Sequence, residues 1–291
     1  MALYMLNLLV TGCSGYLGSS FVKALSEDYV IRPFSLQNQE LQDINFHDLD
    51  AVLHCAAVVH RGSTATSDAY RRVNIEYPLT LARLAKANGV KQFVFISSVS
   101  VYGSLEYIDD SSDCCPKTLY ASSKLEAEER LSDLNSDGFK VAILRFPMIY
   151  GPKAPGNLNL LIRLISYSPI VPLGLIGNKR SFIAIENAVY AIDQVLKQCR
   201  RGVFLLADDE CISTSRLVSI LSKSMGKKIC LVDSRPFAFL FRIIRPSLYK
   251  KIWGNLVVNS SVAKRFLNLE FPVHVDDGVA STVGKNNIAT D

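Results

Sequence analysis

Val10-Thr-Gly-Cys-Ser-Gly-Tyr-Leu-Gly18 follows an apolar run that begins at Leu6, and it leads into a helix-like segment that extends to Ser26. A strand, a glycine-rich turn and a helix in this order bind the pyrophosphate of a dinucleotide, because the helix N-terminus supplies amide donors and a positive dipole. Glycines let the turn approach the pyrophosphate, and the last one lets the helix pack closely on the strand. We therefore predict dinucleotide contacts from Gly12, Ser14, Gly15, Tyr16, Leu17 and Gly18.

Apolar strand-like runs alternate with helical segments through the first half of the chain. The runs lie at 6–10, 29–34, 51–55, 92–96 and 140–145, and helix-like segments at 15–26, 70–88 and 119–134 separate most of them. Continuous apolar strands separated by helices indicate a parallel sheet covered on both faces. We predict an α/β fold with a doubly wound parallel sheet of the Rossmann type and a smaller C-terminal substrate lobe.

The pattern loosens after residue 151, where prolines and glycines interrupt the helical segments. We assign residues 1–151 to a dinucleotide-binding Rossmann domain and residues 152–291 mainly to a substrate-binding lobe. A helix-like stretch from Arg180 to Leu196 and a strand-like stretch from Gly202 to Ala207 predict that roughly residues 180–207 return to the sheet. The second lobe is thus expected to be discontinuous in sequence.

The composition limits the partners that the chain can have. Of its 291 residues, 49% are apolar and 20% are charged, which is typical of a globular protein. The net charge of +5 is not concentrated in one Lys/Arg run, so we expect no nucleic-acid partner, whereas anionic small molecules fit equally well. Seven cysteines without a Cys-x-x-Cys pair or a histidine cluster predict neither disulfides nor a metal site, and we expect a cytoplasmic protein.

Aromatic and aliphatic residues are interleaved with basic ones over residues 236–253. The pattern favours a lobe packing in which basic side chains extend into solvent, with contact with a membrane surface as the alternative. The sequence makes no firm prediction of a membrane partner.

Tyr120 precedes Lys124 by four residues in a predicted helix over 119–134. This spacing places both side chains on one face, where the ammonium can lower the pKa of the phenol. The pair could therefore transfer protons, although a solvated helical pair has the same spacing. The motifs around the pair decide between the two interpretations.

Six motifs in order resemble the extended short-chain dehydrogenases/reductases, in particular the nucleotide-sugar epimerase/dehydratase group. They are Thr11-Gly-x-x-Gly-x-x-Gly18, His54-Cys-Ala-Ala57, Val73-Asn74, Phe95-Ile-Ser-Ser98 with Val101-Tyr-Gly103, Tyr120-x-x-x-Lys124 and Arg145-Phe-x-x-Ile-Tyr-Gly-Pro152. Together they cover most of residues 6–200. The resemblance implies an enzyme with NAD or NADP as its cofactor.

The resemblance also implies a role for each matching residue. Tyr120 would be the acid/base, Lys124 would hold the nicotinamide ribose and lower the phenol's pKa, and Ser98 would hydrogen-bond the reacting oxygen. Further cofactor contacts would come from Ala56, Ala57, Asn74, Ser97, Pro147 and Ile149, with Ser97 also the nearest rival to Ser98. The substrate would contact Ser98, Tyr120, Asn157 and Arg180, the last two at the sugar and the diphosphate.

The choice between NAD and NADP stays open in the sequence. The second strand ends at Phe34-Ser35, without the Asp or Glu that holds the adenosine ribose of NAD. Arg32 could favour a 2′-phosphate or simply be a solvated strand residue. Asp43 and Ile44 could border the adenine, and an exposed loop is the alternative for the aspartate.

The implied reaction is an oxidation or reduction at C4 of a UDP-linked sugar. Val99 and Ser100 stand where 4,6-dehydratases carry an Asp-Glu pair, so dehydration ranks third. Likeness of residues 156–181 to a surface-polysaccharide subgroup favours a 4-keto reductase, with a UDP-hexose 4-epimerase as the alternative. A non-catalytic dinucleotide-binding protein would be expected to lack Tyr120 or Lys124. The resemblance further implies a homodimer that pairs through helices 77–88 and 119–134.

Overall fold

Six parallel strands form the central sheet of the computed structural model, which describes residues 5–37, 39–59 and 66–283 and leaves the side chains of Asn157 and Ser247 undescribed. The strands are β1 (Leu6–Thr11), β2 (Tyr29–Phe34), β3 (Ala51–His54), β4 (Gln92–Ser98), β6 (Lys140–Phe146) and β10 (Gly202–Leu205). Their order is β10-β6-β4-β3-β1-β2, and every neighbouring pair is parallel. The predicted doubly wound α/β fold is confirmed.

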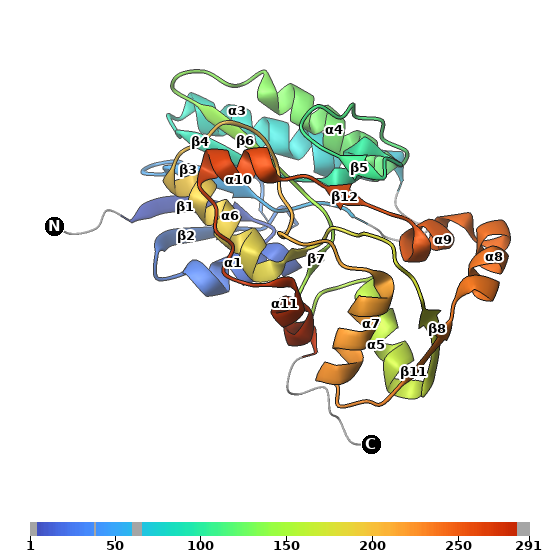
Figure 1. Ribbon diagram of the computed structural model, residues 1–291. Helices are drawn as coiled ribbons and strands as arrows, with labels where there is room; N and C mark the ends of the chain where they lie inside the picture. The colour runs from blue at the N-terminus through green and yellow to red at the C-terminus, as the bar shows by residue number, and fades with distance from the viewer. Residues whose placement is uncertain (1–4, 38, 60–65, 284–291) are drawn as a thin grey trace.

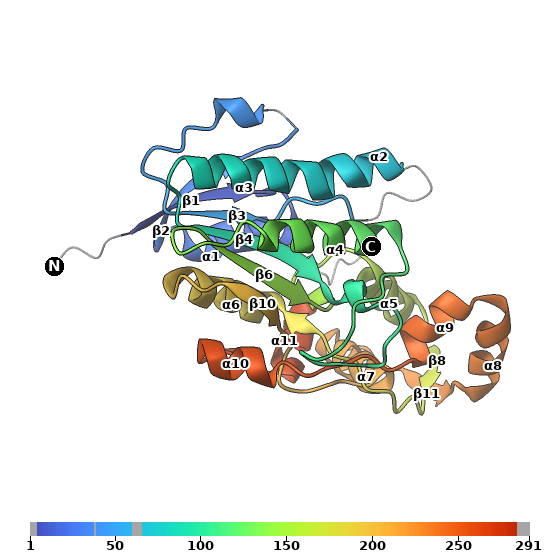
Figure 2. The same ribbon diagram turned by 90° about the horizontal axis from the view of Figure 1, so that it is seen from above.

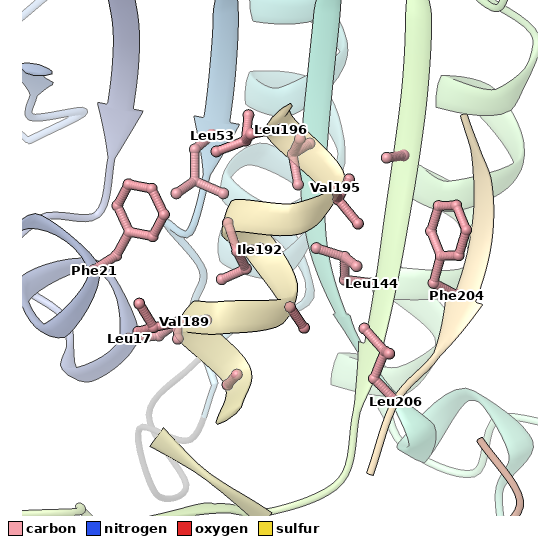
Figure 3. Packing of buried hydrophobic residues seen from close by; sticks show 14 of the residues in the cluster. Leu17, Phe21, Leu53, Leu144, Val189, Ile192, Val195, Leu196, Phe204 and Leu206 are labelled. Atoms are coloured by element: carbon pink, nitrogen blue, oxygen red, sulfur yellow. The ribbon is translucent and has the colours of Figure 1, made fainter. Parts of the chain in front are cut away.

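Helices cover both faces of this sheet, as Figure 2 shows from above. Helices α1 (Tyr16–Leu25) and α6 (Ile185–Lys197) lie on one face, and α3 (Tyr77–Ala87) and α4 (Leu119–Ser132) lie on the other. Apolar residues three or four apart give α6 a buried stripe that includes Val189, Ile192 and Leu196. Figure 3 shows this stripe packed between α1 and the strands. Each such side chain contributes about 1.5–3 kcal/mol when it is fully buried, so this interface holds α6 on the sheet.

The long helical segment before β4 changes its winding midway. It begins as α2 (Ser67–Tyr70), continues as the π-helical η3 (Arg71–Glu76) and ends as α3. The side chain of Thr66 caps its start by accepting a hydrogen bond of 3.2 Å from the amide of Ala69. Single π-helical turns are frequent at functional sites, and this one carries Asn74.

The second lobe lies beyond the carboxyl edge of the sheet (Figure 1). Four short elements of the first half have not yet been given: η1 (Leu41–Asp43), η4 (Val99–Tyr102), β5 (Tyr107–Ile108) and β7 (Ile149–Tyr150). The remaining elements of the second half are α5 (Asn157–Tyr167), β8 (Ile170–Gly174), β9 (Ile183–Ala184), α7 (Thr214–Ser224), β11 (Cys230–Asp233), α8 (Arg235–Ile244), α9 (Pro246–Trp253), β12 (Val257–Val258), α10 (Ser261–Leu267) and α11 (Val275–Thr282). In the described ranges, no helix is both long enough and apolar enough to cross a bilayer.

A buried carboxylate connects the second lobe to the sheet. Asp208 accepts hydrogen bonds from the Tyr150 hydroxyl at 2.7 Å, the Asn187 amide at 2.8 Å and the backbone of Ala184 at 3.1 Å. The last contact holds the chain at the start of α6. The helix expected from Arg180 onwards therefore begins only at Ile185, because the residues before it are extended and β9 pairs with β7. The predicted domain boundaries stay a prediction.

Candidate active site

Most of the site residues predicted from the sequence gather where the parallel strands end. Strands β1, β3, β4 and β6 all present their carboxyl ends at one edge of the sheet. The glycine turn follows β1, Ala56 and Ala57 follow β3, Ser97 and Ser98 end β4, and Pro147 follows β6. Ligands of doubly wound sheets bind at this edge, so the topology brings these segments together.

The turn after β1 has room for glycine alone at two positions. Gly12 has a φ of +75°, and a Cβ there would lie 2.6 Å from the backbone nitrogen of Ala56. A Cβ on Gly18 would lie 2.3 Å from the carbonyl oxygen of Gly12. Gly15 is the N-cap of α1 and has no side chain to cap it, so the first amides of the helix keep their donors for a ligand. This cradle fits the pyrophosphate of a dinucleotide.

The other residues of the turn point in different directions. Ser14 is exposed, whereas Leu17 is buried in the core between α1 and the sheet. The hydroxyl of Tyr16 is buried, has no hydrogen-bond partner among the described residues, and lies 2.8 Å from where a Cβ of Gly151 would be. Burial raises the pKa of Tyr16, so it stays protonated.

Tyr120 lies in the first turn of α4, which the side chain of Thr118 caps by accepting a hydrogen bond of 3.1 Å from the amide of Ala121. Burial raises the pKa of the Tyr120 phenol to about 12, and a hydrogen bond with Ser98 opposes that shift. The Ser98 oxygen also accepts a hydrogen bond of 3.1 Å from the amide of Ser100. The structure therefore brings Ser98 and Tyr120 together at the strand edge.

Lys124 is buried one helical turn further along α4, with 2% of the residue exposed. Its ammonium donates a hydrogen bond of 2.8 Å to the carbonyl oxygen of Ile96 and lies 4.3 Å from the centre of the Phe95 ring. Burial lowers the pKa of Lys124 to about 8, and the nearby Glu128 carboxylate partly offsets this. Burial dominates at Tyr120, so the pKa of the phenol lies above its ordinary value, and the expected lowering by Lys124 stays a prediction.

A buried polar network behind this pair was not predicted. Glu128 accepts hydrogen bonds from Ser97 and from Arg145, whose Nη2 lies 2.5 Å from the carboxylate, and Arg145 Nη1 donates to the Tyr102 hydroxyl at 2.7 Å. The bond to Glu128 occupies Ser97, which leaves Ser98 as the serine at Tyr120. One sequence signal existed, since Glu128 follows Lys124 by four residues on the same helix face.

Asn74 joins the end of β3 to α4. It is fully buried and exchanges two hydrogen bonds with the backbone of Val58, at 2.8 Å and 3.0 Å. Its amide also donates a hydrogen bond of 3.0 Å to Ser123, which lies between Tyr120 and Lys124. The structure thus makes Asn74 a positioning residue, and the half-buried Ala56 and Ala57 lie on the segment that it holds.

His54 is a further buried residue at this edge. Its Nδ1 lies 2.9 Å from the Thr11 hydroxyl, its ring stacks against Phe93 and Phe95, and its Nε2 has no partner among the described residues. Burial, together with the Lys124 charge, lowers the pKa of His54 to about 3, so the ring is neutral at physiological pH. His54 belongs to one of the six sequence motifs, but the sequence alone predicted no role for it.

The remaining predicted residues lie on the periphery. Asp43 ends the short η1 and caps its own turn, since its carboxylate accepts from the amide of Glu40 at 3.4 Å, and Ile44 packs against the core beside α3. Arg32 donates a hydrogen bond of 2.9 Å to the carbonyl of His47. Ile149 lies in β7 after the buried Pro147.

Two predicted substrate residues lie in the second lobe. Asn157 begins α5, and its side chain lies outside the described part of the structure. Arg180 donates hydrogen bonds to the carbonyl oxygens of Lys250 at 3.2 Å and Gly254 at 3.1 Å. Its guanidinium therefore holds the end of α9.

Comparisons with known proteins agree with this geometry. The model of the NAD dependent epimerase/dehydratase family matches residues 8–205. A UDP-glucose 4-epimerase of Vibrio cholerae is 29% identical over 310 residues, covering 95% of this chain and 94% of that protein. A second relative is an N-acetyl-alpha-D-glucosaminyl-diphospho-ditrans,octacis-undecaprenol 4-epimerase of Escherichia coli O157:H7. It is 27% identical over 244 residues, which cover 77% of this chain and 73% of that protein.

The fold is also that of solved structures. The crystal structure of a UDP-glucuronic acid 4-epimerase from Bacillus cereus in complex with NAD superposes with a TM-score of 0.75. The two chains are 20% identical, and the superposition covers 95% of this chain and 97% of that one.

Proposed function

Since the chain belongs to the NAD dependent epimerase/dehydratase family, we propose that it is an NAD(P)-dependent enzyme that inverts C4 of a nucleotide sugar, with a UDP-linked hexose or N-acetylhexosamine as substrate. The observation that carries the proposal is the hydrogen bond between Ser98 and Tyr120, beside the buried Lys124 and at the same sheet edge as the glycine turn. The alignment with the V. cholerae 4-epimerase supports it, because that alignment spans 95% of this chain and so includes the second lobe.

The cofactor would be held by the glycine turn, the backbone at Ala56 and Ala57, and Lys124. When bound, it supplies the acceptor and donor of hydride for C4 of the sugar. The fit rests on the Cβ-excluding positions at Gly12 and Gly18 and on the uncapped amides of α1. Because β2 ends without an acidic residue, both NAD and NADP belong in the assay.

Tyr120 moves the proton in this proposal. As a phenolate it takes the proton of the 4-hydroxyl, and as a phenol it returns that proton when the sugar ketone is reduced. Ser98 donates a hydrogen bond to the same sugar oxygen. A pKa near 12 keeps Tyr120 protonated at neutral pH, so abstraction requires positive charge to arrive with the bound ligands and lower that pKa.

Two other reactions are weaker candidates. The 4-keto reductase that the sequence favoured uses the same Ser98 and Tyr120, and we place it second because the curated relatives named above are 4-epimerases. Dehydration across C5 and C6 needs an additional acid and base. Val99 is buried and apolar, and the Ser100 hydroxyl is buried without a described partner, so neither provides them.

A substrate panel tests the proposal. The purified protein is incubated with NAD or NADP and UDP-glucose, UDP-N-acetylglucosamine or N-acetylglucosaminyl-diphospho-undecaprenol, and with NADH or NADPH and a UDP-4-keto sugar. Products are followed by NMR and cofactor absorbance. Inversion at C4 without net change of the cofactor is expected, with loss of turnover in Tyr120→Phe. Net cofactor oxidation on the keto sugar alone would instead identify a reductase. No turnover with any substrate, together with equal cofactor binding by wild type and Tyr120→Phe, would reject an enzymatic function.

A further inference from the structure

Helix α8 exposes a group of large apolar side chains. No residue of the helix is buried, and the exposed fraction is 71% for Phe239, 66% for Ile243 and 61% for Ile244. Single exposed apolar residues are ordinary on soluble proteins, whereas a contiguous group marks a surface that another molecule covers. The described part of the chain provides no such cover for α8.

The inner side of α8 is already occupied. Phe241 packs against Trp253 of α9, with ring centres 5.9 Å apart, and Trp253 also stacks on Tyr249. The indole nitrogen of Trp253 donates a hydrogen bond of 3.1 Å to Ser234 just before α8. Phe239, Leu240 and Ile243 lie away from this contact, since residues three and four apart share a helix face. Figures 1 and 2 both show the α8–α9 pair (residues 235–253) at the rim of the second lobe, far from the sheet.

The charges on this pair are all positive. Residues 234–254 contain the basic Arg235, Arg242, Arg245, Lys250 and Lys251 and no acidic residue. Their sum of +5 equals the net charge of the entire chain. Within the ranges that the structure describes, Arg235 pairs with Asp233 and the other four form no ion pair. The apolar face is therefore surrounded by positive charge that lacks a counter-charge.

We propose that the α8–α9 pair docks this protein on the surface of an anionic lipid bilayer. Phe239, Leu240 and Ile243 enter the boundary between headgroups and acyl chains, and the four unpaired basic residues contact lipid phosphates. A second copy of the chain is a poorer occupant, because two such patches would bring together eight positive charges that have no described counter-charge. The docking requires no spanning helix.

The docked pair is connected to the predicted substrate residues. Arg180 donates its hydrogen bonds to the carbonyl oxygens of Lys250 and Gly254, at the end of α9. Docking would therefore place this arginine, and the part of the lobe around it, close to the bilayer. The proposal goes beyond the catalytic function and does not depend on it.

Vesicle co-sedimentation of the full chain tests the proposal. We expect binding to vesicles of phosphatidylcholine mixed with phosphatidylglycerol, weaker binding to phosphatidylcholine alone, and weakening by salt. Phe239→Ser with Ile243→Ser should lower the partition coefficient about tenfold or more. Arg242→Gln with Arg245→Gln should lower it about fivefold per charge on the anionic vesicles only.

A matched control lies on α10. Val262 is an exposed apolar residue on a helix far from the α8–α9 pair, so Val262→Ser should leave vesicle binding unchanged. Circular dichroism checks that each variant is folded. If the apolar variants do not fold, the arginine variants alone test the proposal. Equal binding of wild type and both double variants would overturn the proposal. So would an absence of binding to anionic vesicles, or a concentration-dependent dimer that Phe239→Ser abolishes. None of these measurements uses a sugar substrate, so their failure is separate from failure of the proposed reaction.

Discussion

The ammonium of Lys124 donates a hydrogen bond of 2.8 Å to the carbonyl oxygen of Ile96. This contact ties α4 to β4 just before the strand reaches Ser97 and Ser98, so the helix that carries Tyr120 is held at the strand end. Burial disfavours the charged form of the lysine and lowers its pKa from 10.5 to about 8. Lys124 thus holds the site together at a cost in stability.

That cost predicts a pH dependence. Between pH 8 and 10.5 the unfolded chain binds more protons at Lys124 than the folded chain does, so the folded state gains stability as pH rises through this window. The gain is about 1.4 kcal/mol per pH unit. Urea unfolding of wild type and of Lys124→Met should be compared from about pH 7.5 to about pH 10.5, which covers this window. We expect the unfolding free energy of wild type to increase relative to that of the variant as pH rises. A difference that is constant with pH would contradict the lowered pKa.

The buried ion pair between Glu128 and Arg145 should be costly to break. Glu128→Gln leaves the guanidinium without its counter-charge, and we expect a loss of about 3–5 kcal/mol of unfolding free energy. Glu126→Gln is the matched control, because Glu126 forms an exposed ion pair with Arg130 on the same helix and should cost less than about 1 kcal/mol. Chemical denaturation at neutral pH measures the unfolding free energy of both variants. Equal losses would show that the burial of Glu128 does not increase the cost of breaking its ion pair.

The glycine turn should not accept a methyl group at Gly18. A Cβ there would meet the carbonyl oxygen of Gly12 at 2.3 Å, so α1 must shift away from the turn. We expect Gly18→Ala to weaken NAD binding at least about tenfold, since the amide donors move with the helix. Gly138→Ala is the control, because among the described residues no atom beyond its chain neighbours lies within 4 Å of its Cβ position. Calorimetric titration with NAD compares the two, and unchanged affinity in Gly18→Ala would refute the cradle.

The two neighbouring serines should have separable effects. Ser98→Ala removes the hydrogen bond to Tyr120 and the proposed one to the sugar oxygen, and we expect kcat to fall about 10²–10³-fold with little change in Tm. Ser97→Ala removes a donor to the buried Glu128, so Tm should fall while kcat of the folded enzyme changes little. Steady-state kinetics and thermal unfolding distinguish the two roles. The opposite pattern would make Ser97 the serine that acts on substrate.

The predicted homodimer is not tested by the structure, but the structure restricts the surface that can form it. Ala121, Glu128 and Leu131 are buried in their own chain, and Leu125 packs there in part. The side of α4 that they share therefore faces the sheet of the same chain. A dimer through α3 and α4 would have to use their outer faces.

Local patterns were sufficient to predict the sheet, the glycine turn and the convergence of the motif residues. Strands and helices follow from apolar periodicity, and a parallel sheet places the carboxyl ends of its strands at one edge whatever the details of packing. The contact between Ser98 and Tyr120 was expected only from the resemblance, because Tyr120 lies on α4 and not at a strand end. The residue at which α6 begins could not be predicted, because it depends on Asp208 and on the pairing of β7 with β9, which are contacts between distant parts of the chain.

What the sequence left open was decided by burial and by contacts between distant residues. The pattern of residues 236–253 favoured packing within the lobe, but the same pattern also fits an outward-facing segment, and in the structure no residue of α8 is buried. The pKa of Tyr120 lies above its ordinary value, because desolvation by the surrounding protein outweighs the hydrogen bond with Ser98. Glu128 and Arg145 are 17 residues apart and meet only when α4 packs on β6. Spacing along one helix thus identifies which residues can act together, whereas desolvation and long-range pairing, which exist only in the packed chain, determine their charge and their partners.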